Sequence, residues 1–199
     1  MKVIGLTGGI ASGKSTIANL LRSLGAPVFD ADAESRAMVA KGSPALDEIA
    51  KTFGTEYLQA DGELNRAKMA ELVFNDKAAL KKLEGIIHKN VHAAAQSFLA
   101  DCRSKNLPAA VLDVPLLIEC GWHKDVDEVW LVAVDSETQI ARAMQRSQMT
   151  REEVKARIAA QMPLEEKRAC ADFVIDNSGP LEAAQKTVTD AWRALVAEV

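Results

Sequence analysis

The residues Gly8-Gly9-Ile10-Ala11-Ser12-Gly13-Lys14-Ser15 fit the pattern G-x-x-x-x-G-K-[ST], and they decide which fold the rest of the chain must have. An apolar, strand-like run precedes them at Lys2–Thr7, and a helical pattern follows at Lys14–Leu24. Glycines let the backbone curl so that successive N–H groups converge on phosphate oxygens, and the helix dipole adds its positive end. The stretch therefore predicts a phosphate-binding loop between a strand and a helix. A chance glycine-rich turn is the alternative that this context disfavours.

Individual loop residues have expected roles in binding a nucleotide. Lys14 reaches the β- and γ-phosphates, and the Ser15 hydroxyl is placed to ligate Mg²⁺. The chain lacks the N/T-K-x-D motif with which GTPases read guanine, and the D-x-x-G match at Asp176–Gly179 follows the last expected strand, so a GTPase switch is not expected. The nucleotide-binding residues expected here are Gly8, Gly9, Ile10, Ala11, Ser12, Gly13, Lys14, Ser15 and Thr16.

Short apolar runs alternate with longer helical patterns, which is typical of helices packed around a parallel sheet. The expected strands are Lys2–Thr7, Pro27–Asp30, Ala109–Asp113, Glu128–Val134 and Phe173–Ile175. The expected helices are Lys14–Leu24, Ala31–Ala40, Pro44–Phe53, Arg66–Phe74, Lys77–Ala100, Glu137–Arg146, Arg151–Met162 and Leu181–Val199. The expected fold class is α/β, the three-layer P-loop NTPase fold with a five-stranded parallel sheet.

Two helical stretches interrupt this alternation within a single expected domain, 1–199. About eighty residues separate the second and third expected strands, more than one crossover needs, so we interpret 42–105 as an inserted helical subdomain. The stretch 142–168 carries seven cationic and four acidic side chains. We interpret it as a mobile helical lid over the active site, and a solvated helical surface is the alternative.

The bulk composition restricts the class of protein. Of 199 residues, 48% are hydrophobic and 26% are charged, which is typical of a soluble globular protein, and the net charge of −4 argues against a general nucleic-acid binder. There is no apolar run of membrane length and no signal-like N-terminus. Cys102, Cys120 and Cys170 show no C-x-x-C spacing and are read as reduced thiols. We therefore expect a cytoplasmic protein, a monomer or weak homo-oligomer, with no nucleic-acid or membrane partner.

Carboxylates follow the second and third expected strands, where ligands of open parallel sheets bind. An alcohol that accepts a phosphoryl group needs a base for its proton, whereas a phosphate acceptor is already ionised. Asp32 therefore predicts a hydroxyl acceptor, with helix capping as the alternative, and for Asp30 the two readings weigh equally. Asp113 is suited to holding Mg²⁺ directly or through water, and a turn or cap beside Pro115 is its alternative. His88 and His92 lack the Glu of H-E-x-x-H, so zinc is not expected.

Further motifs, in order and without large gaps, resemble the dephospho-CoA kinase family over residues 3–179. The Leu-Thr-Gly-Gly-Ile form of the loop and the Val-Pro-Leu-Leu run are its most discriminating pieces. The matching segments are Ile4–Ile10, Ser12–Ser15, Asp30–Asp32, Phe53–Gly54, Asp61–Arg66, Val73–Phe74, Leu83–Glu84, Ile87–His88, Val114–Glu119, Gln139, Arg142, Arg146, Gln161, Ala171–Asp172 and Asp176–Asn177.

The resemblance implies Mg-ATP-dependent phosphorylation of the ribose 3′-hydroxyl of dephospho-CoA, the last step of CoA synthesis. It implies that Asp32 is the general base and that Ser15 ligates Mg²⁺. With the residues read directly, the expected catalytic residues are Asp32, Lys14 and Arg142, the expected metal residues are Ser15 and Asp113, and Asp32 also contacts the substrate. Arg66 and His88 would face the CoA side, Arg142 and Arg146 would belong to the lid that neutralises the triphosphate, and Asn177 would sit near the adenine. Three departures from the family pattern are Lys89 after His88, Ile118 in place of Phe, and Ser147 after Arg146.

Two other functions are compatible with the loop. One is another small-molecule P-loop kinase with a hydroxyl acceptor. The other is a regulatory or scaffold protein that binds ATP without transferring phosphate, against which Asp32 and the cationic stretch argue.

Overall fold

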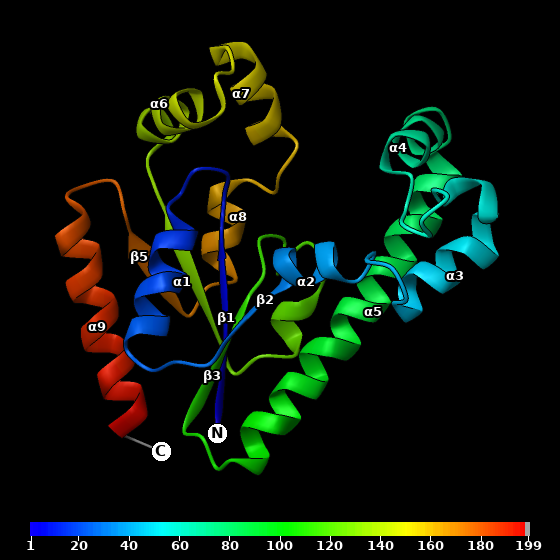
Figure 1. Ribbon diagram of the computed structural model, residues 1–199. Coiled ribbons are helices and arrows are strands. Elements are labelled where there is room, and N and C mark those ends of the chain that lie inside the picture. Colours follow the sequence, from blue (N-terminus) through cyan, green and yellow to red (C-terminus); the bar gives the residue numbers. More distant parts are fainter. Residues whose placement is uncertain (198–199) are drawn as a thin grey trace. The chain divides into compact units, whose positions relative to one another are not determined.

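A parallel sheet flanked by helices organises the protein, as the computed structural model, which describes residues 1–197, shows (Figure 1). The strands are β1 (Lys2–Gly8), β2 (Val28–Asp30), β3 (Ala109–Asp113), β4 (Glu128–Ala133) and β5 (Phe173–Asp176). The helices are α1 (Lys14–Ser23), α2 (Ala31–Ala37), α3 (Pro44–Phe53), α4 (Arg66–Asn75), α5 (Lys77–Ser104), α6 (Ser136–Ser147), α7 (Arg151–Ala159), α8 (Leu164–Ala169) and α9 (Leu181–Ala197). Two short 3₁₀ helices are η1 (Thr55–Tyr57) and η2 (Trp122–Lys124).

The sheet has five strands in the order β2-β3-β1-β4-β5, which confirms the expected fold class. β1 lies at its centre and runs parallel to both β3 and β4, with Leu6 opposite Asp113 and Gly8 opposite Val132. The carboxyl end of β1, where the predicted loop begins, is therefore next to the carboxyl ends of β3 and β4. This is the edge at which open parallel sheets bind their ligands.

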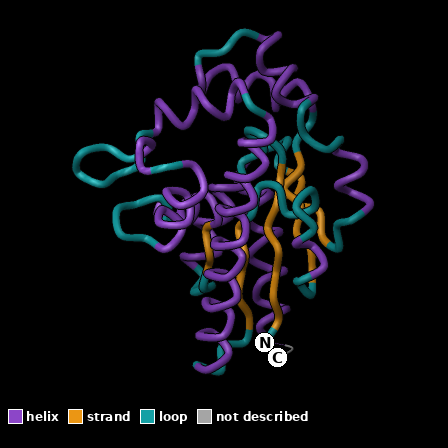
Figure 2. The backbone as a smooth tube through the Cα atoms, turned by 90° about the vertical axis from the view of Figure 1, so that its right-hand side faces the viewer, coloured by secondary structure: helices purple, strands orange, loops and turns teal. Residues whose placement is uncertain are grey.

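One face of the sheet is covered by α1 and α9, and Figure 2 shows helices on both sides of the strands. Ile17 and Leu21 of α1 are fully buried against side chains of β1, β3, β4 and β5. One face of α9 is apolar, and its residues at spacings of four, four and three are all buried in the same cluster. These residues are Ala184, Val188, Trp192 and Leu195. α8 contacts β4.

The chain divides into two compact units, which we call the sheet unit (1–29 and 101–199) and the helical unit (30–100). The helical unit has a core of its own, consisting of Val39, Ala45, Leu46, Ile49, Leu64, Met69 and Ile86. It begins at Asp30, earlier than the predicted insertion at 42–105, because Val39, just beyond α2, is buried in this core. The boundaries of the predicted subdomain and of the lid, 142–168, remain predictions.

Helix ends differ from the sequence prediction mainly in the predicted lid. A single helix was expected at Arg151–Met162, whereas α7 ends at Ala159 and a separate, unpredicted α8 begins at Leu164. Pro163 accounts for the break, because a proline pushes the residue before it out of the helical region. The expected end of the last helix at Val199 lies outside the described residues. None of the helices in 1–197 is both long and apolar enough to cross a membrane.

We expect Leu21→Ala to lower the free energy of unfolding by about 2–5 kcal/mol, because it removes a fully buried side chain from the core that supports α1. Denaturant unfolding followed by circular dichroism measures this loss. Leu181→Ala is the matched control, since Leu181 is 38% exposed at the start of α9 and its truncation should change the stability by less than about 1 kcal/mol. Equal losses in the two variants would contradict the core described here.

Candidate active site

The glycine-rich loop joins β1 directly to α1 through two left-handed residues. Gly13, the N-cap of α1, has φ 91° and ψ 13°, and Ala11 has φ 55°. The Ser12 N–H donates to the Gly9 carbonyl at 3.1 Å, and the Thr16 N–H donates to the Gly13 carbonyl at 2.9 Å. The backbone therefore curls back on itself just before α1, whose positive dipole end and first amides lie at the loop. This is the geometry that binds phosphate.

Asn177, the residue after β5, supports the loop from the side of the sheet. Its side chain is buried and donates from Nδ2 to the Ser12 carbonyl at 2.8 Å, while its own N–H donates to the Ala133 carbonyl at 2.8 Å. A Cβ added at Gly13 would lie 2.2 Å from that Nδ2, so glycine is required there for space as well as for its positive φ. Arg142 of α6 donates from a guanidinium nitrogen to the Asn177 carbonyl at 2.9 Å.

Lys14 and Asp113 form a largely buried ion pair at the carboxyl end of the sheet. Their side chains are 14% and 4% exposed, so each charge needs a partner to offset its lost hydration. Lys14 is the first residue of α1 and Asp113 the last residue of β3. The structure thus brings the predicted phosphate-binding ammonium and the predicted metal-binding carboxylate together.

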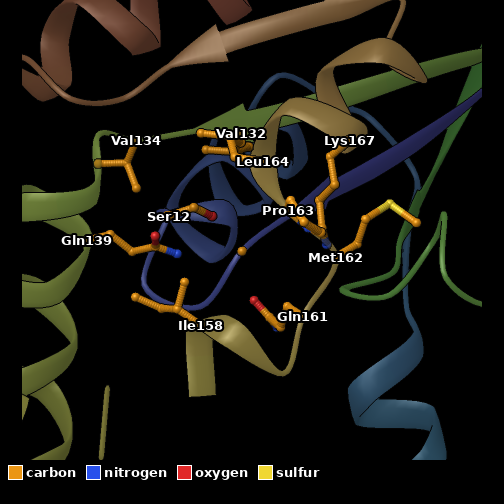
Figure 3. A pocket seen from close by; sticks show the side chains of 11 residues that line it. Ser12, Val132, Val134, Gln139, Ile158, Gln161, Met162, Pro163, Leu164 and Lys167 are labelled. Carbon is orange, nitrogen blue, oxygen red and sulfur yellow. The ribbon is translucent and has the colours of Figure 1, made fainter. Parts of the chain in front are cut away.

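Two glutamines that sequence reasoning recorded only as parts of the family resemblance contact the loop directly. Gln139 of α6 donates from Nε2 to the Ile10 carbonyl at 2.8 Å, and the Ile10 N–H donates to Gln161 Oε1 at 3.0 Å. Both side chains line a pocket beside the loop, together with Ser12 and Lys167 (Figure 3). In the sequence, Gln139 and Gln161 stood out only as two of the residues that match the family pattern.

Lys167 of α8, one of the seven cationic residues of the predicted lid, is buried. It is 1% exposed, and its ammonium nitrogen lies 2.7 Å from Glu119 Oε1. The Met162 N–H also donates to Glu119 Oε1, at 3.4 Å. The ion pair joins α8 to the segment that follows β3, so Lys167 contributes to the fold around the pocket. Its charge is therefore not part of an exposed cationic surface.

The loops after β4 and β5 are joined at the start of α6. Asp135 caps α6, and hydrogen bonds from Thr138 hold the pKa of the Asp135 carboxyl below its ordinary value. The Asp135 N–H donates to the Ser178 hydroxyl at 2.9 Å, and hydrogen bonds from Ser178 lower the pKa of Asp176. Both carboxylates are therefore ionised at neutral pH. Asp135 fixes the start of the helix that carries Gln139 and Arg142, and Asp176 holds Ser178 beside it.

The remaining predicted residues of the sheet unit are exposed at its helix ends. Ser15 and Thr16 are exposed in the first turn of α1, next to the loop. Arg146 is exposed in the last turn of α6, whereas Arg142 on the same helix is half-buried. The part that Ser15, Thr16 and Arg146 would play in binding remains a prediction.

The residues predicted for the acceptor belong to the helical unit. The Asp30 carboxylate accepts a hydrogen bond from the Ala33 N–H at 2.9 Å and caps α2, which is one of its two predicted roles. Asp32 lies in the first turn of the same helix and is exposed. Arg66, the first residue of α4, and His88, in α5, are exposed as well. The functional roles of Asp32, Arg66 and His88 remain predictions.

Comparison with known proteins gives consistent matches over nearly the whole chain. A family model described as dephospho-CoA kinase matches residues 2–183. A dephospho-CoA kinase of Symbiobacterium thermophilum is 47% identical over 98% of this chain and 81% of that protein, and one of Geobacter sulfurreducens is 45% identical over 96% and 98%. The structure of a dephospho-CoA kinase from Campylobacter jejuni matches with a TM-score of 0.76 at 27% identity, covering 98% of both chains.

We expect Gly13→Ala to displace the loop, because the new Cβ would collide with Asn177 Nδ2 in addition to being strained at a left-handed φ. The expected result is loss of measurable ATP binding in titration calorimetry. Gly25→Ala is the matched control: Gly25 also has a positive φ, of 86°, but no atom lies within 4 Å of its added Cβ. The control should lose about 1–2 kcal/mol of stability and keep its ATP affinity. An equal loss of ATP affinity in both variants would contradict the collision.

Proposed function

Since this chain belongs to the dephospho-CoA kinase family and is an ATP-dependent phosphotransferase, we propose that its loop, Lys14, Asp113 and Asp32 transfer the γ-phosphoryl group of ATP to the ribose 3′-hydroxyl of dephospho-CoA. The observation that carries this proposal is the buried Lys14–Asp113 pair beside the curled loop, within a chain that matches the family over residues 2–183. The product of the reaction is coenzyme A. The residue roles below are part of the proposal.

Phosphate binding is assigned to the loop amides and Lys14. Charge on the transferred group spreads over its equatorial oxygens, so amides and a cation that already face those oxygens lower the barrier without reorganising. In the structure the Lys14 ammonium is balanced by the Asp113 carboxylate. An arriving triphosphate offers the ammonium a more highly charged partner, and Lys14 would turn toward the β- and γ-phosphates.

The metal site is assigned to Ser15 and Asp113. A hydroxyl and a carboxylate are the oxygen ligands that Mg²⁺ prefers, and Mg²⁺ in phosphotransferases commonly takes one or two protein ligands, with phosphates and water supplying the rest. Within residues 1–197, no three His, Cys, Asp or Glu side chains gather as a complete metal cage, and such an ion does not need one. When bound, Mg²⁺ would neutralise part of the charge on the phosphates. Release of Lys14 toward the phosphates would leave the Asp113 carboxylate available to the ion or its waters.

Asp32 is proposed as the base that accepts the proton of the 3′-hydroxyl. Asp30 and Asp32, the two carboxylates at the end of β2 and the start of α2, differ in their surroundings. Asp30 accepts a hydrogen bond from the Ala33 N–H, whereas Asp32 is exposed on the first turn of α2. A general base must reach the proton that it removes, and an exposed carboxylate can do so.

The cationic residues are assigned to the charges of the two substrates. Arg142 and Arg146 are four residues apart on α6 and therefore share a face of the helix, so both can face the triphosphate. Arg142 also holds the Asn177 carbonyl and with it the support of the loop, and Asn177 would lie near the adenine. Arg66 and His88 are proposed to face the CoA side, where the internal diphosphate of dephospho-CoA offers a guanidinium an anionic partner.

We expect the purified protein to release ADP only when dephospho-CoA and Mg-ATP are both present, with a product heavier by one phosphoryl group. A coupled ADP assay and mass spectrometry measure this. Lys14→Ala should lower turnover by at least about 10²–10³-fold, because it removes a preorganised cation from the transferring group. Comparable turnover with shikimate or AMP would favour another small-molecule kinase, and substantial activity of the Lys14 variant would contradict the phosphate-binding role.

We expect Asp32→Asn to lower kcat by about 10²–10⁴-fold and to leave ATP affinity unchanged, because the amide cannot accept the hydroxyl proton. Asp30→Asn is its matched control: asparagine caps helices as well as aspartate does, so this variant should keep its stability and activity. Steady-state kinetics and ATP calorimetry separate the two effects. Loss of turnover in Asp30→Asn with normal turnover in Asp32→Asn would move the proposed base to the other carboxylate.

A further inference from the structure

We propose that Gln139 and Gln161 are positioning residues that hold the Ile10 peptide group of the phosphate-binding loop, and that residue 9 is glycine so that they can reach it. The inference deepens the proposed function, on which it rests, because it assigns part of the ATP affinity to two side chains outside the loop. We refer to the two contacts together as the glutamine clamp.

The clamp uses both backbone polar groups of a single loop residue. The Ile10 carbonyl accepts a hydrogen bond from Gln139 Nε2 at 2.8 Å, and the Ile10 N–H donates one to Gln161 Oε1 at 3.0 Å. The chemistry of the peptide settles the orientation of each side-chain amide, because a carbonyl needs a donor and an N–H needs an acceptor. The two glutamines therefore have opposite roles, Gln139 as donor and Gln161 as acceptor.

Gly9 acquires a physical explanation from this arrangement. The general loop pattern allows any residue at position 9. The backbone of Gly9 does not have a left-handed φ, so its conformation does not require glycine either. A Cβ added at Gly9 would lie 2.8 Å from Gln139 Nε2 and 3.5 Å from Gln161 Oε1. The first distance is closer than real Cβ contacts come, so the Gln139 amide, at the end of a flexible side chain, would have to move away from the loop. Glycine at position 9 is therefore the clearance through which the clamp reaches the backbone.

A second contact attaches the same part of the loop to α6 and α7. Ala11 packs against the small apolar cluster of Ile140, Ala143 and Val154 that joins these two helices. Gln139 precedes Ile140 on α6, and Gln161 lies between the end of α7 and the start of α8. The loop is thus fixed by a polar contact at Ile10 and an apolar contact at Ala11, so its shape depends on how α6 and α7 are placed.

The use of neutral amides in the clamp follows from what the loop must bind. A carboxylate in the place of either glutamine would add a negative charge near the expected triphosphate, and an ammonium would compete with Lys14 for the phosphates. A side-chain amide supplies a donor or an acceptor without charge. The clamp can therefore preorganise the loop at any pH without changing the charge that the nucleotide meets.

The first test compares identical substitutions at the two glutamines, with ATP affinity measured by calorimetry in the absence of dephospho-CoA. Gln139→Glu replaces a donor with an acceptor that faces a carbonyl, and we expect it to weaken ATP binding by about tenfold. Gln161→Glu keeps the acceptor and should weaken binding by no more than about threefold, as its added charge alone would do. Gln145→Glu, an exposed change on the same helix, is the control and should leave affinity unchanged. Equal losses at 139 and 161 would overturn the donor and acceptor assignment.

The second test is a double-mutant cycle between Gly9 and Gln139. We expect Gly9→Ala to weaken ATP binding by about tenfold in the parent protein, but by less than about threefold in a Gln139→Ala background, because the side chain that meets the new Cβ is gone. A purely structural defect would lower the melting temperature and the affinity additively in both backgrounds. Additive losses would therefore overturn the proposal. Because ATP binding is the readout, a failure to phosphorylate dephospho-CoA would count against the proposed function and leave this test intact.

Discussion

The left-handed bend at Gly13, packed against a buried Asn177, is the constraint on which the rest of the site depends. It lets β1 pass into α1 within a few residues, so that the helix starts at the edge of the sheet and Lys14 is its first residue. A neighbouring side chain must hold this bend and fill the space beside Gly13. Asn177 is this neighbour and donates to the Ser12 carbonyl, and β4 and α6 hold Asn177 through Ala133 and Arg142. The loop is therefore shaped by three strands of the sheet, and not by its own sequence alone.

Charge in the sheet unit is arranged so that each buried cation has an anion from a neighbouring element. Lys14 of α1 pairs with Asp113 of β3, and Lys167 of α8 pairs with Glu119. Removing one partner of a buried pair leaves an uncompensated charge, so both pairs constrain the positions of the elements that carry them. The pairs differ in what a nucleotide can change. Under the proposed function, phosphates would replace Asp113 as the partner of Lys14, whereas Lys167 is almost fully buried and keeps its structural partner.

The sequence predicted the features that local pattern determines. The strands read as apolar runs because both faces of a parallel sheet are buried, and the loop motif located the β1–α1 junction. α8 was missed because it is short and follows Pro163. The contacts from Gln139 and Gln161 to Ile10 join residues more than a hundred positions apart, and no local pattern predicts such contacts. The burial of Lys167 could not be predicted from its charge, because burial depends on how α8 packs.

In the proposed function, charged and neutral polar groups around the loop have different tasks. Charged groups would recognise the phosphates, but a charge that also held the loop in shape would be drawn away when the nucleotide arrived, as Lys14 would be from Asp113. Amides are suited to holding the shape: Asn177 supports one side of the loop and the glutamines hold Ile10, each through hydrogen bonds to the backbone. Because these contacts carry no net charge, the charge of a bound phosphate would compete with them only weakly. A preorganised loop of this kind can exchange the partner of its lysine without losing its curvature, and that allows the same backbone amides to serve every turnover.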